Sequence, residues 1–425
     1  MLYFKKGGPG LSLTDEDLIM GIRKALEKRS PLDRTSKVLI LPPDITRIHS
    51  KAGTLTLAAR DYYGDKLTDV MPALGTHRPM SEEELNEMFP GLDHNLVRPH
   101  KWRTEVVTLG EVPAEYLEEV SGGKVSYSWP AQVNRILVEG GHDLILSIGQ
   151  VVPHEVIGFA NHNKNIFVGT GGAEGIHKSH FLGAAYGMER IMGEADSPVR
   201  KVLNYAEDHF AKDLPILYVL TVVSPDQQGK IHVRGLYIGD SRECFIKAAA
   251  LSKEVNFTPV EKPLKRVVVY LDPKEIRSTW LGNKSIYRTR MAIADGGELI
   301  VIAPGLQEFG EDRQIDSLIR KYGYFTTEET LKKVRENNDL RDNLSAAAHL
   351  IHGSSEGRFK IIYAPGHMTK EEIESVGYNY ADLEEMENLF AIKNKTTGFH
   401  KDTKGEDFYL IENPALGLWS CKKHS

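Results

Sequence analysis

The residues best suited to chemistry are concentrated between Gln150 and Phe181, in the stretch QVVPHEVIGFANHNKNIFVGTGGAEGIHKSHF. It holds four histidines and two lysines: His154, His162, His177, His180, Lys164 and Lys178. A neutral imidazole near pH 7 suits a general base or a metal ligand. Lys164, between Asn163 and Asn165, is either a covalent anchor or a solvated loop lysine. The stretch therefore predicts a reaction centre, with these alternatives open.

Two short motifs upstream carry further groups of the same kind. DITR places Asp44 three residues before Arg47, so an aspartate can orient a guanidinium that binds a carboxylate. A surface ion pair at a turn is the plainer interpretation. GTHRP places His77 between a small-residue turn and a proline. This histidine is a general base, a ligand, or a residue that bonds backbone at a helix entry.

Each group of polar residues follows a run that predicts a buried strand. The strands expected over Ser36–Leu41, Thr68–Leu74 and His142–Gln150 lead into DITR, GTHRP and the central stretch. A helix is expected from Ser81, where SEEE forms a capping box. This strand–helix order predicts a parallel sheet whose carboxyl-terminal edge carries the site. Three histidine-bearing strand ends favour a buried reaction centre.

Other segments predict the rest of the architecture. Trp129–Glu139 resembles a helix, and the polar, proline-bearing segment Asn256–Lys265 is the best linker candidate. A second strand–helix series follows, in which two strands end in APG, at 303–305 and 364–366. We expect an α/β protein of two domains, each with a mostly parallel sheet flanked by helices, and an active site in the interdomain cleft. The domains are 1–260, catalytic and cofactor-binding, and 261–425, smaller and contributing substrate contacts.

Composition narrows the class of protein. A length of 425 residues with 41% hydrophobic content suits two globular domains, and a net charge of −6 argues against a nucleic-acid partner. The two cysteines are far apart, so a metal would need nitrogen or oxygen ligands from the protein. Neither a signal peptide nor an 18-residue apolar run is found, so no membrane partner is expected and a cytoplasmic location is the default.

The motifs as a group resemble the nickel-dependent lactate racemase family. DITR, GTHRP and PHEVIGFANHNK, followed by His180, have the order and spacing of that family, with ten residues from His154 to Lys164 and sixteen from Lys164 to His180. The resemblance covers nearly the whole chain. It implies a racemase or epimerase of 2-hydroxy acids that uses a nickel-pincer nucleotide, pyridinium-3,5-bisthiocarboxylic acid mononucleotide nickel. It also implies cofactor-biosynthesis proteins as partners in maturation.

The resemblance assigns roles to seven residues. These are His77 and His154 as acid/base pair, Lys164 as the lysine that can hold the cofactor, His180 as cofactor and nickel ligand, Asp44 and Arg47 beside the substrate, and Lys284 of TWLGNKS as a substrate-binding residue. The implied reaction removes the hydroxyl proton to a histidine and the C2 hydrogen as hydride to the cofactor. The planar 2-keto acid then takes the hydride back on its other face.

Some residues depart from the family pattern. The commoner loop GFSGGxK is here GFANHNK, and the lactate enzymes' glutamine and tryptophan are replaced at Leu281 and near Leu344. The identity of the 2-hydroxy acid is therefore left open, and sugar acids are among the candidates. Two other hypotheses remain: a zinc-type hydrolase or lyase that uses His154, His177 and His180, although no HExxH occurs, and a non-catalytic cofactor carrier or sensor. The oligomeric state is not predicted.

Overall fold

The chain divides into two compact units. The computed structural model describes residues 1–226, 229–310, 312–414 and 417–421. Contacts group Met1–Leu182 with Arg190–Asn256 as the first unit, and Gly183–Glu189 with Phe257–Ser425 as the second. In the described part of the chain, every helix is too short or too polar to cross a bilayer.

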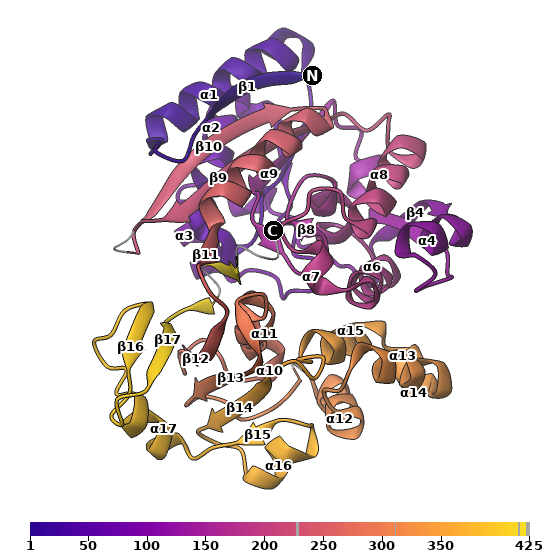
Figure 1. The fold of residues 1–425 in the computed structure, drawn as a ribbon. Coiled ribbons are helices and arrows are strands. Elements are labelled where there is room, and N and C mark those ends of the chain that lie inside the picture. The colour runs from indigo at the N-terminus through magenta and orange to yellow at the C-terminus, as the bar shows by residue number, and fades with distance from the viewer. Residues whose placement is uncertain (227–228, 311, 415–416, 422–425) are drawn as a thin grey trace. The chain divides into compact units, whose positions relative to one another are not determined.

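The first unit is built on a six-stranded mixed sheet (Figure 1). Its strands, in spatial order, are β1 (Leu2–Gly7), β10 (Ile231–Gly239), β9 (Ile216–Pro225), β6 (Leu144–Gln150), β2 (Val38–Leu41) and β3 (Leu67–Val70). The four strands from β9 to β3 are parallel, whereas β10 pairs antiparallel with both of its neighbours, β9 and β1. The predicted parallel sheet is confirmed. The segments 36–41, 68–74 and 142–150 contain most of β2, β3 and β6, and β2 pairs in parallel with both β3 and β6.

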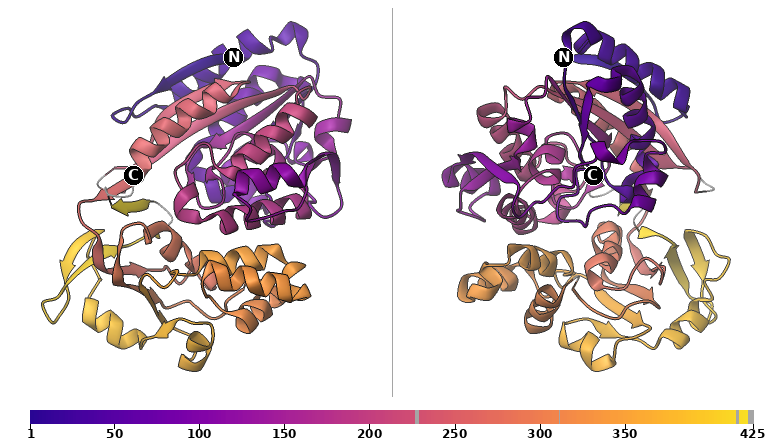
Figure 2. Two further views of the ribbon diagram at one scale, coloured as in Figure 1. Left: turned by 45° about the vertical axis from the view of Figure 1, so that its right-hand side comes forward. Right: turned by 180° about the vertical axis from the view of Figure 1, so that it is seen from behind.

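Helices cover both faces of this sheet. The helices α1 (Asp15–Arg29), α2 (Ala52–Tyr63) and α3 (Glu82–Met88) share one core with Leu217 and Val219 of β9. Side chains alternate along a strand, so Tyr218 points to the other face. There the ring of His162 lies between Tyr218 and Phe245 of α9 (Arg242–Asn256). Figures 1 and 2 show α9 lying along β9 and β10.

The helix expected over Trp129–Glu139 is wrong for most of its length. Trp129–Asn134 is strand β5, which pairs antiparallel with β4 (Val106–Val112), and only Ile136–Glu139 is helical, as α5. Tertiary contacts favour the strand conformation of this segment. Trp129 donates Nε1–H to Gly175 O at 2.8 Å, and its ring packs edge-on against Phe167. Helix α4 (Ala114–Ser121) connects the two strands in sequence.

A series of short elements follows β6. They are β7 (Pro153–His154), β8 (Gly158–Phe159), the π-helical turn η5 (Asn165–Gly169), α6 (Ala173–Tyr186), α7 (Met188–Ile191) and α8 (Pro198–Phe210). Helix α8 begins after Ser197, whose side chain caps it by accepting from Arg200 N. The 3-10 turns η1 to η4 are at Leu32–Arg34, Ile45–Ser50, Gly64–Lys66 and His94–Leu96.

The second unit has its own six-stranded, mostly parallel sheet. In spatial order the strands are β15 (Asn379–Tyr380), β14 (Lys360–Pro365), β13 (Ile293–Ala303), β12 (Leu264–Tyr270), β17 (Asp407–Ile411) and β16 (Gly398–Lys401). Its helices are α10 (Thr279–Gly282), α11 (Lys284–Thr289), α12 (Arg313–Tyr322), α13 (Thr327–Glu336), α14 (Asn338–Arg341), α15 (Leu344–His352), α16 (Lys370–Ser375) and α17 (Leu383–Phe390). The two APG motifs end the neighbouring parallel strands β13 and β14, which confirms that they are equivalent strand ends.

The segment expected to be a linker is partly a strand. Within Asn256–Lys265, Phe257–Val260 forms β11, which pairs parallel with β18 (Leu418–Cys421). The β-branched and aromatic residues of FTPV favour this conformation, and Pro259 is tolerated because the pair has only two strands.

Candidate active site

The three predicted polar motifs do meet at one edge of the first sheet. Strands β3, β2 and β6 are adjacent and parallel, so their carboxyl ends lie together. Asp44, His77 and His154 each follow one of these ends. Asn165 ties the next segment to the same edge, because its Nδ2 donates to Leu41 O at 3.2 Å and to Ser147 Oγ at 3.0 Å.

Asp44 and His77 form a direct pair. The Nδ1 of His77 lies 2.6 Å from Asp44 Oδ2, and Asp44 Oδ1 accepts from Thr46 N and Thr46 Oγ1. Burial raises the pKa of Asp44, but the hydrogen bonds from His77 and Thr46 outweigh it, so the net pKa is lowered. The aspartate is therefore ionised and can only accept. It follows that His77 carries its proton on Nδ1 and keeps a lone pair on Nε2.

The backbone on either side of His77 is fixed by local geometry. Gly75 has φ +60°, a conformation that favours glycine, and its N–H donates to Gly169 O at 2.8 Å. The predicted capping box is present at Ser81, whose side chain caps α3 together with Glu84. These contacts hold the histidine between a tight turn and a capped helix. The side chain of His77 is 58% exposed, so solutes can reach its ring.

His154 lies in a different environment. It ends the short strand β7, which pairs with β8 through Gly158, and its side chain is 12% exposed. Gly158 has φ +85°, and a Cβ there would lie 1.8 Å from Glu194 O, so no other residue fits. The Val156 N–H donates to His154 Nδ1 at 3.1 Å, which places the proton of the neutral ring on Nε2. Burial, and then the charges of Lys164, His180 and Arg47, lower the pKa of His154 despite Glu155.

Lys164 is partly buried where the chain enters the π-helical turn η5. Burial and the nearby charge of Arg47 lower its pKa to about 8, with smaller opposing effects from Glu155 and Asp44. The alternative of an ordinary solvated loop lysine does not describe this residue. π-Helical turns occur often at functional sites, and this one begins directly after the lysine.

His180 lies on α6 and is oriented by its own helix. Its Nδ1–H donates to Ile176 O at 2.7 Å, one turn earlier, so the lone pair of the neutral ring is on Nε2. Because the charges of Arg47, Lys164 and His180 all act on His154, and that of Asp44 acts on Lys164, these residues are within electrostatic reach of one another. One site of the first unit thus brings together six of the seven predicted residues.

The N-terminal part of the chain is similar to a domain of known proteins. Residues 16–190 match the profile of the lactate racemase N-terminal domain. This part of the chain is therefore similar to the N-terminal domain of lactate racemases. Lactate racemase of Thermoanaerobacterium thermosaccharolyticum is 23% identical over 325 residues, an alignment that covers 71% of this chain and 69% of that protein.

Two solved structures share the fold. A protein from Thermotoga maritima has a TM-score of 0.80 and 24% identity, over 98% of this chain and 100% of its own. The lactate racemase apoprotein from Thermoanaerobacterium thermosaccharolyticum has a TM-score of 0.69 and 18% identity, over 96% and 93%. These structures confirm the predicted α/β fold class.

The site offers the imidazole of His180, with its Nε2 lone pair, for a metal. Among the described residues, no group of three His, Cys, Asp or Glu side chains is placed to hold a metal ion. The zinc alternative needed His154, His177 and His180 as such a group, and the structure does not supply it. His177 instead packs edge-on against Trp102, and His162 is buried between the rings of Tyr218 and Phe245.

The seventh residue, Lys284, belongs to the second unit, and its role stays a prediction. It begins α11 directly after Asn283, whose Oδ1 accepts from Tyr363 OH at 2.9 Å and from Tyr378 OH at 3.2 Å. The rings of Tyr378 and Tyr363 stack with centroids 5.1 Å apart. The backbone that carries Lys284 is therefore anchored by a buried polar network.

Sequence reasoning missed two residues of the site. Glu155 directly follows His154 in the PHEV motif, and its charge raises the pKa of both His154 and Lys164. Its position in the motif was the available signal. Arg200, far along the chain on α8, also lowers the pKa of Lys164, and nothing in its sequence context distinguishes it from a surface arginine.

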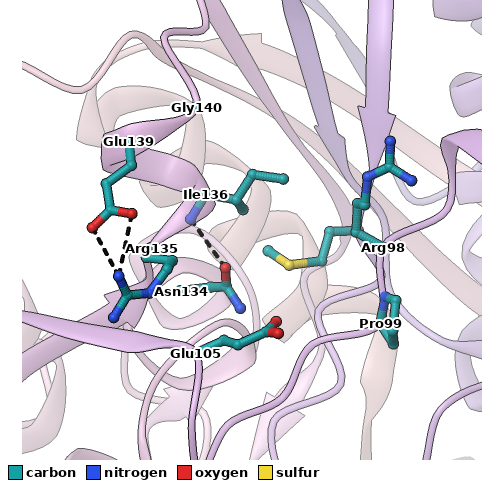
Figure 3. Close-up of a pocket in the computed structure, with 9 residues that line it drawn as sticks. Arg98, Pro99, Glu105, Asn134, Arg135, Ile136, Glu139 and Gly140 are labelled. Carbon is teal, nitrogen blue, oxygen red and sulfur yellow. Dashed lines mark hydrogen bonds and ion pairs between the residues drawn. The ribbon is translucent and has the colours of Figure 1, made fainter.

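A separate hollow of about 330 Å³ lies elsewhere in the first unit, and none of the predicted site residues lines it (Figure 3). Its polar groups largely satisfy one another. Arg135 donates to both oxygens of Glu139 at 3.2 and 3.3 Å, and Asn134 Oδ1 accepts from Ile136 N at 3.1 Å. This hollow is not the reaction centre described above.

Proposed function

We propose that the protein is a racemase or epimerase that inverts C2 of a 2-hydroxy acid with the help of a nickel-pincer nucleotide. The observation that carries the proposal is the pair of differently bonded histidines, His77 and His154, beside Lys164 and His180. The similarity of residues 16–190 to the lactate racemase N-terminal domain, and of the chain to a lactate racemase, supports the reaction class. The choice of 2-hydroxy acid extends beyond lactate, because lactate racemase is 23% identical to this chain.

His77 is arranged to take the hydroxyl proton of the substrate. Its Nδ1–H donates to Asp44, so Nε2 is the basic atom. When Nε2 takes a proton the ring becomes positive, and the ionised Asp44 stabilises that charge. The exposed edge of His77 leaves Nε2 open to a substrate oxygen.

His154 offers the complementary group. With Nδ1 accepting from Val156 N–H, its Nε2–H is a hydrogen-bond donor to an oxygen of the substrate. Inversion in one direction needs one acceptor and one donor, and the opposite direction needs the two rings to exchange these roles. Arg47 supplies a positive charge for the substrate carboxylate in the same site.

The residues present fit the proposed cofactor. The Nε2 lone pair of His180 suits nickel. Burial lowers the pKa of the Lys164 amine to about 8, so part of it is neutral near pH 7 and would condense with a thiocarboxylic acid of the nucleotide, forming a thioamide and releasing water. When bound, the nucleotide supplies a hydride acceptor for C2. Proteins of cofactor biosynthesis are the expected partners in loading it.

The test uses protein loaded with cofactor and a panel of single-enantiomer 2-hydroxy acids, including aldonates, read by chiral chromatography. His77→Ala and His154→Ala should each lower interconversion by about 10²–10⁴-fold, the usual contribution of acid/base groups. His177→Ala is the matched control, because His177 lies one helical turn from His180 yet packs on Trp102, and it should retain activity.

Retained activity in both His77→Ala and His154→Ala would overturn the mechanism. Cofactor binding without turnover on any acid of the panel would favour the carrier or sensor hypothesis instead. Lys284→Ala tests the remaining predicted contact, and a raised KM with little change in kcat is the expected result.

A further inference from the structure

Arg200 is a buried charge with no carboxylate among the hydrogen-bond partners found in the described residues. It is 1% exposed on α8, and its guanidinium donates to Phe159 O at 2.7 Å, Asn161 O at 3.2 Å and Asn163 Oδ1. A buried guanidinium is destabilising unless hydrogen bonds satisfy its donors. Nη1 and Nη2 bind alternate residues of one loop, 159–163, which leads directly into Lys164, whereas the buried Nε has no hydrogen-bond partner among the described residues.

That loop has a backbone that needs support. Asn161 and His162 have φ of 68° and 59°, a left-handed conformation that is unfavourable for most non-glycine residues. Such outliers persist only where the surroundings hold them. Here the carbonyl of Asn161 is bound by Arg200, and the ring of His162 stacks on Tyr218 with centroids 3.9 Å apart.

Asn163 links Arg200 to a second buried charge. Its Oδ1 accepts from Arg200, while its Nδ2 donates to Glu207 Oε2 at 3.0 Å and to Asn204 Oδ1 at 2.8 Å. Glu207 also accepts from Tyr218 OH at 2.7 Å. The residue before Lys164 is thus fixed at all the polar atoms of its side chain, between an arginine and a glutamate of the same helix.

The residue after Lys164 is fixed as well. Asn165 donates its backbone N–H to His162 O at 2.8 Å, and its side chain binds Leu41 O and Ser147 Oγ at the ends of β2 and β6. The lysine therefore lies between one anchor on α8 and another on the sheet. Neither anchor is explained by the acid/base chemistry of the histidines.

We propose that Arg200, acting through Asn163 and the 159–163 loop, is a positioning residue that holds Lys164 in the reaction centre and favours its neutral amine. Two effects contribute: the guanidinium fixes the strained loop, and its charge opposes a second positive charge nearby. The direction agrees with the electrostatics, since burial comes first and the charges of Arg47 and then Arg200 further lower the pKa of Lys164. The inference rests on the proposed role of Lys164, but its first test needs no cofactor.

The test measures Lys164 in cofactor-free protein by competitive acetylation with acetic anhydride from pH 6 to 11, followed by peptide mass spectrometry. In the wild type, labelling of Lys164 should have a midpoint near pH 8. In Arg200→Gln the midpoint should move toward ~10.4, the value of an ordinary lysine. Arg290→Gln is the matched control, because Arg290 is also buried but pairs with Glu189 in the second unit.

An unchanged midpoint in folded Arg200→Gln would overturn the proposal, and so would an equal shift in Arg290→Gln. If Arg200→Gln does not fold, the Asn163→Ala variant tests the proposal instead. It keeps Arg200 and its contacts with the carbonyls of Phe159 and Asn161 but removes the Asn163 side chain, which links Arg200 to the residue before Lys164. A smaller upward shift is then expected, and no shift contradicts the proposal.

A second readout separates this proposal from the function it rests on. After loading with cofactor, intact mass reports the fraction of protein with a covalent adduct, which should fall in Arg200→Gln and not in Arg290→Gln. If the acetylation midpoint shifts in Arg200→Gln but no protein, wild type included, forms the adduct, the covalent role of Lys164 is contradicted. The positioning role of Arg200 is then still supported.

Discussion

Two aspartate–histidine pairs of the first unit, Asp44–His77 and Asp69–His142, differ in how exposed the histidine ring is. Asp44 binds His77 Nδ1 at 2.6 Å, and the His77 side chain is 58% exposed. Asp69 binds His142 Nε2 at 3.0 Å, and the His142 side chain is 0% exposed. Both aspartates are lowered in pKa by hydrogen bonds that outweigh their burial.

The two pairs differ in the other partners of the aspartate and in the position of the histidine relative to the strands. Asp69 also binds Arg98 Nε and Thr68 Oγ1, both at 2.8 Å, so it belongs to a closed network. His142 precedes the start of β6, whereas His77 follows the end of β3. An aspartate–histidine pair is therefore not a site in itself. It becomes a candidate when the ring lies at the carboxyl edge of the sheet, beside other titratable groups.

The largest expected effect separates the pairs by activity. Asp44→Asn removes the charge that stabilises a protonated His77, so kcat/KM of loaded protein should fall by about 10²-fold. Its thermal midpoint should change little, because Asp44 also caps η2 and asparagine caps as well as aspartate. Steady-state kinetics and a melting curve on the same sample decide. Wild-type kcat/KM in Asp44→Asn would remove the functional side of the comparison.

The reverse outcome is expected for the closed pair. Asp69→Asn should lower the free energy of unfolding by about 1–3 kcal/mol, since Arg98 and His142 lose a charged acceptor. Activity per folded molecule should be unchanged. Urea unfolding measures the first quantity and active-site titration the second. A loss of turnover without a loss of stability would place Asp69 in the reaction centre after all.

Buried rings without a carboxylate give a third contrast, in pH dependence. Burial is the main cause that lowers the pKa of His162, and it lowers that of His349 to about 3. Below about pH 6.5 these histidines are protonated in the unfolded chain but stay neutral in the folded protein. The free energy of unfolding is therefore highest above about pH 6.5 and decreases as the pH falls. Urea unfolding at pH 7.5, 6.5, 5.5 and 4.5 should show this. His162→Phe, which keeps a ring beside Tyr218, should flatten the fall; the same slope as wild type would contradict the assignment.

The smallest expected effect concerns the helix that follows His77. Ser81→Ala removes the cap of α3 and should cost about 1 kcal/mol in the free energy of unfolding. Because the cap acts on the helix and not on the ring, kcat/KM should drop by less than it does in Asp44→Asn. A loss as large as that of Asp44→Asn would mean that the capped helix, rather than the aspartate, orients His77.

The elements around the site were predictable where the signal is local. Buried apolar runs identified β2, β3 and β6, and the capping box SEEE identified the start of α3. The β4–β5 pair was not predicted, since it depends on residues such as Trp129 finding Phe167 and Gly175 in the fold.

The residues of the site were likewise predictable only where the sequence signal is local. Asp44, His77 and His154 follow strands and were found by their positions. The direct bond between Asp44 and His77, and the burial of Arg200 against the lysine loop, join residues more than thirty positions apart. A single sequence carries no signal for such pairings, because they are decided by how α8 and the strand ends pack.

The central claim is that the C2 hydrogen moves as hydride while the histidines handle only the hydroxyl proton. The most direct measurement follows a C2-deuterated 2-hydroxy acid through cofactor-loaded protein in ordinary water, with the product of opposite configuration analysed by mass spectrometry. The account predicts that the inverted product retains its deuterium. Inverted product that has exchanged deuterium for solvent hydrogen would show direct proton abstraction at C2 and contradict it.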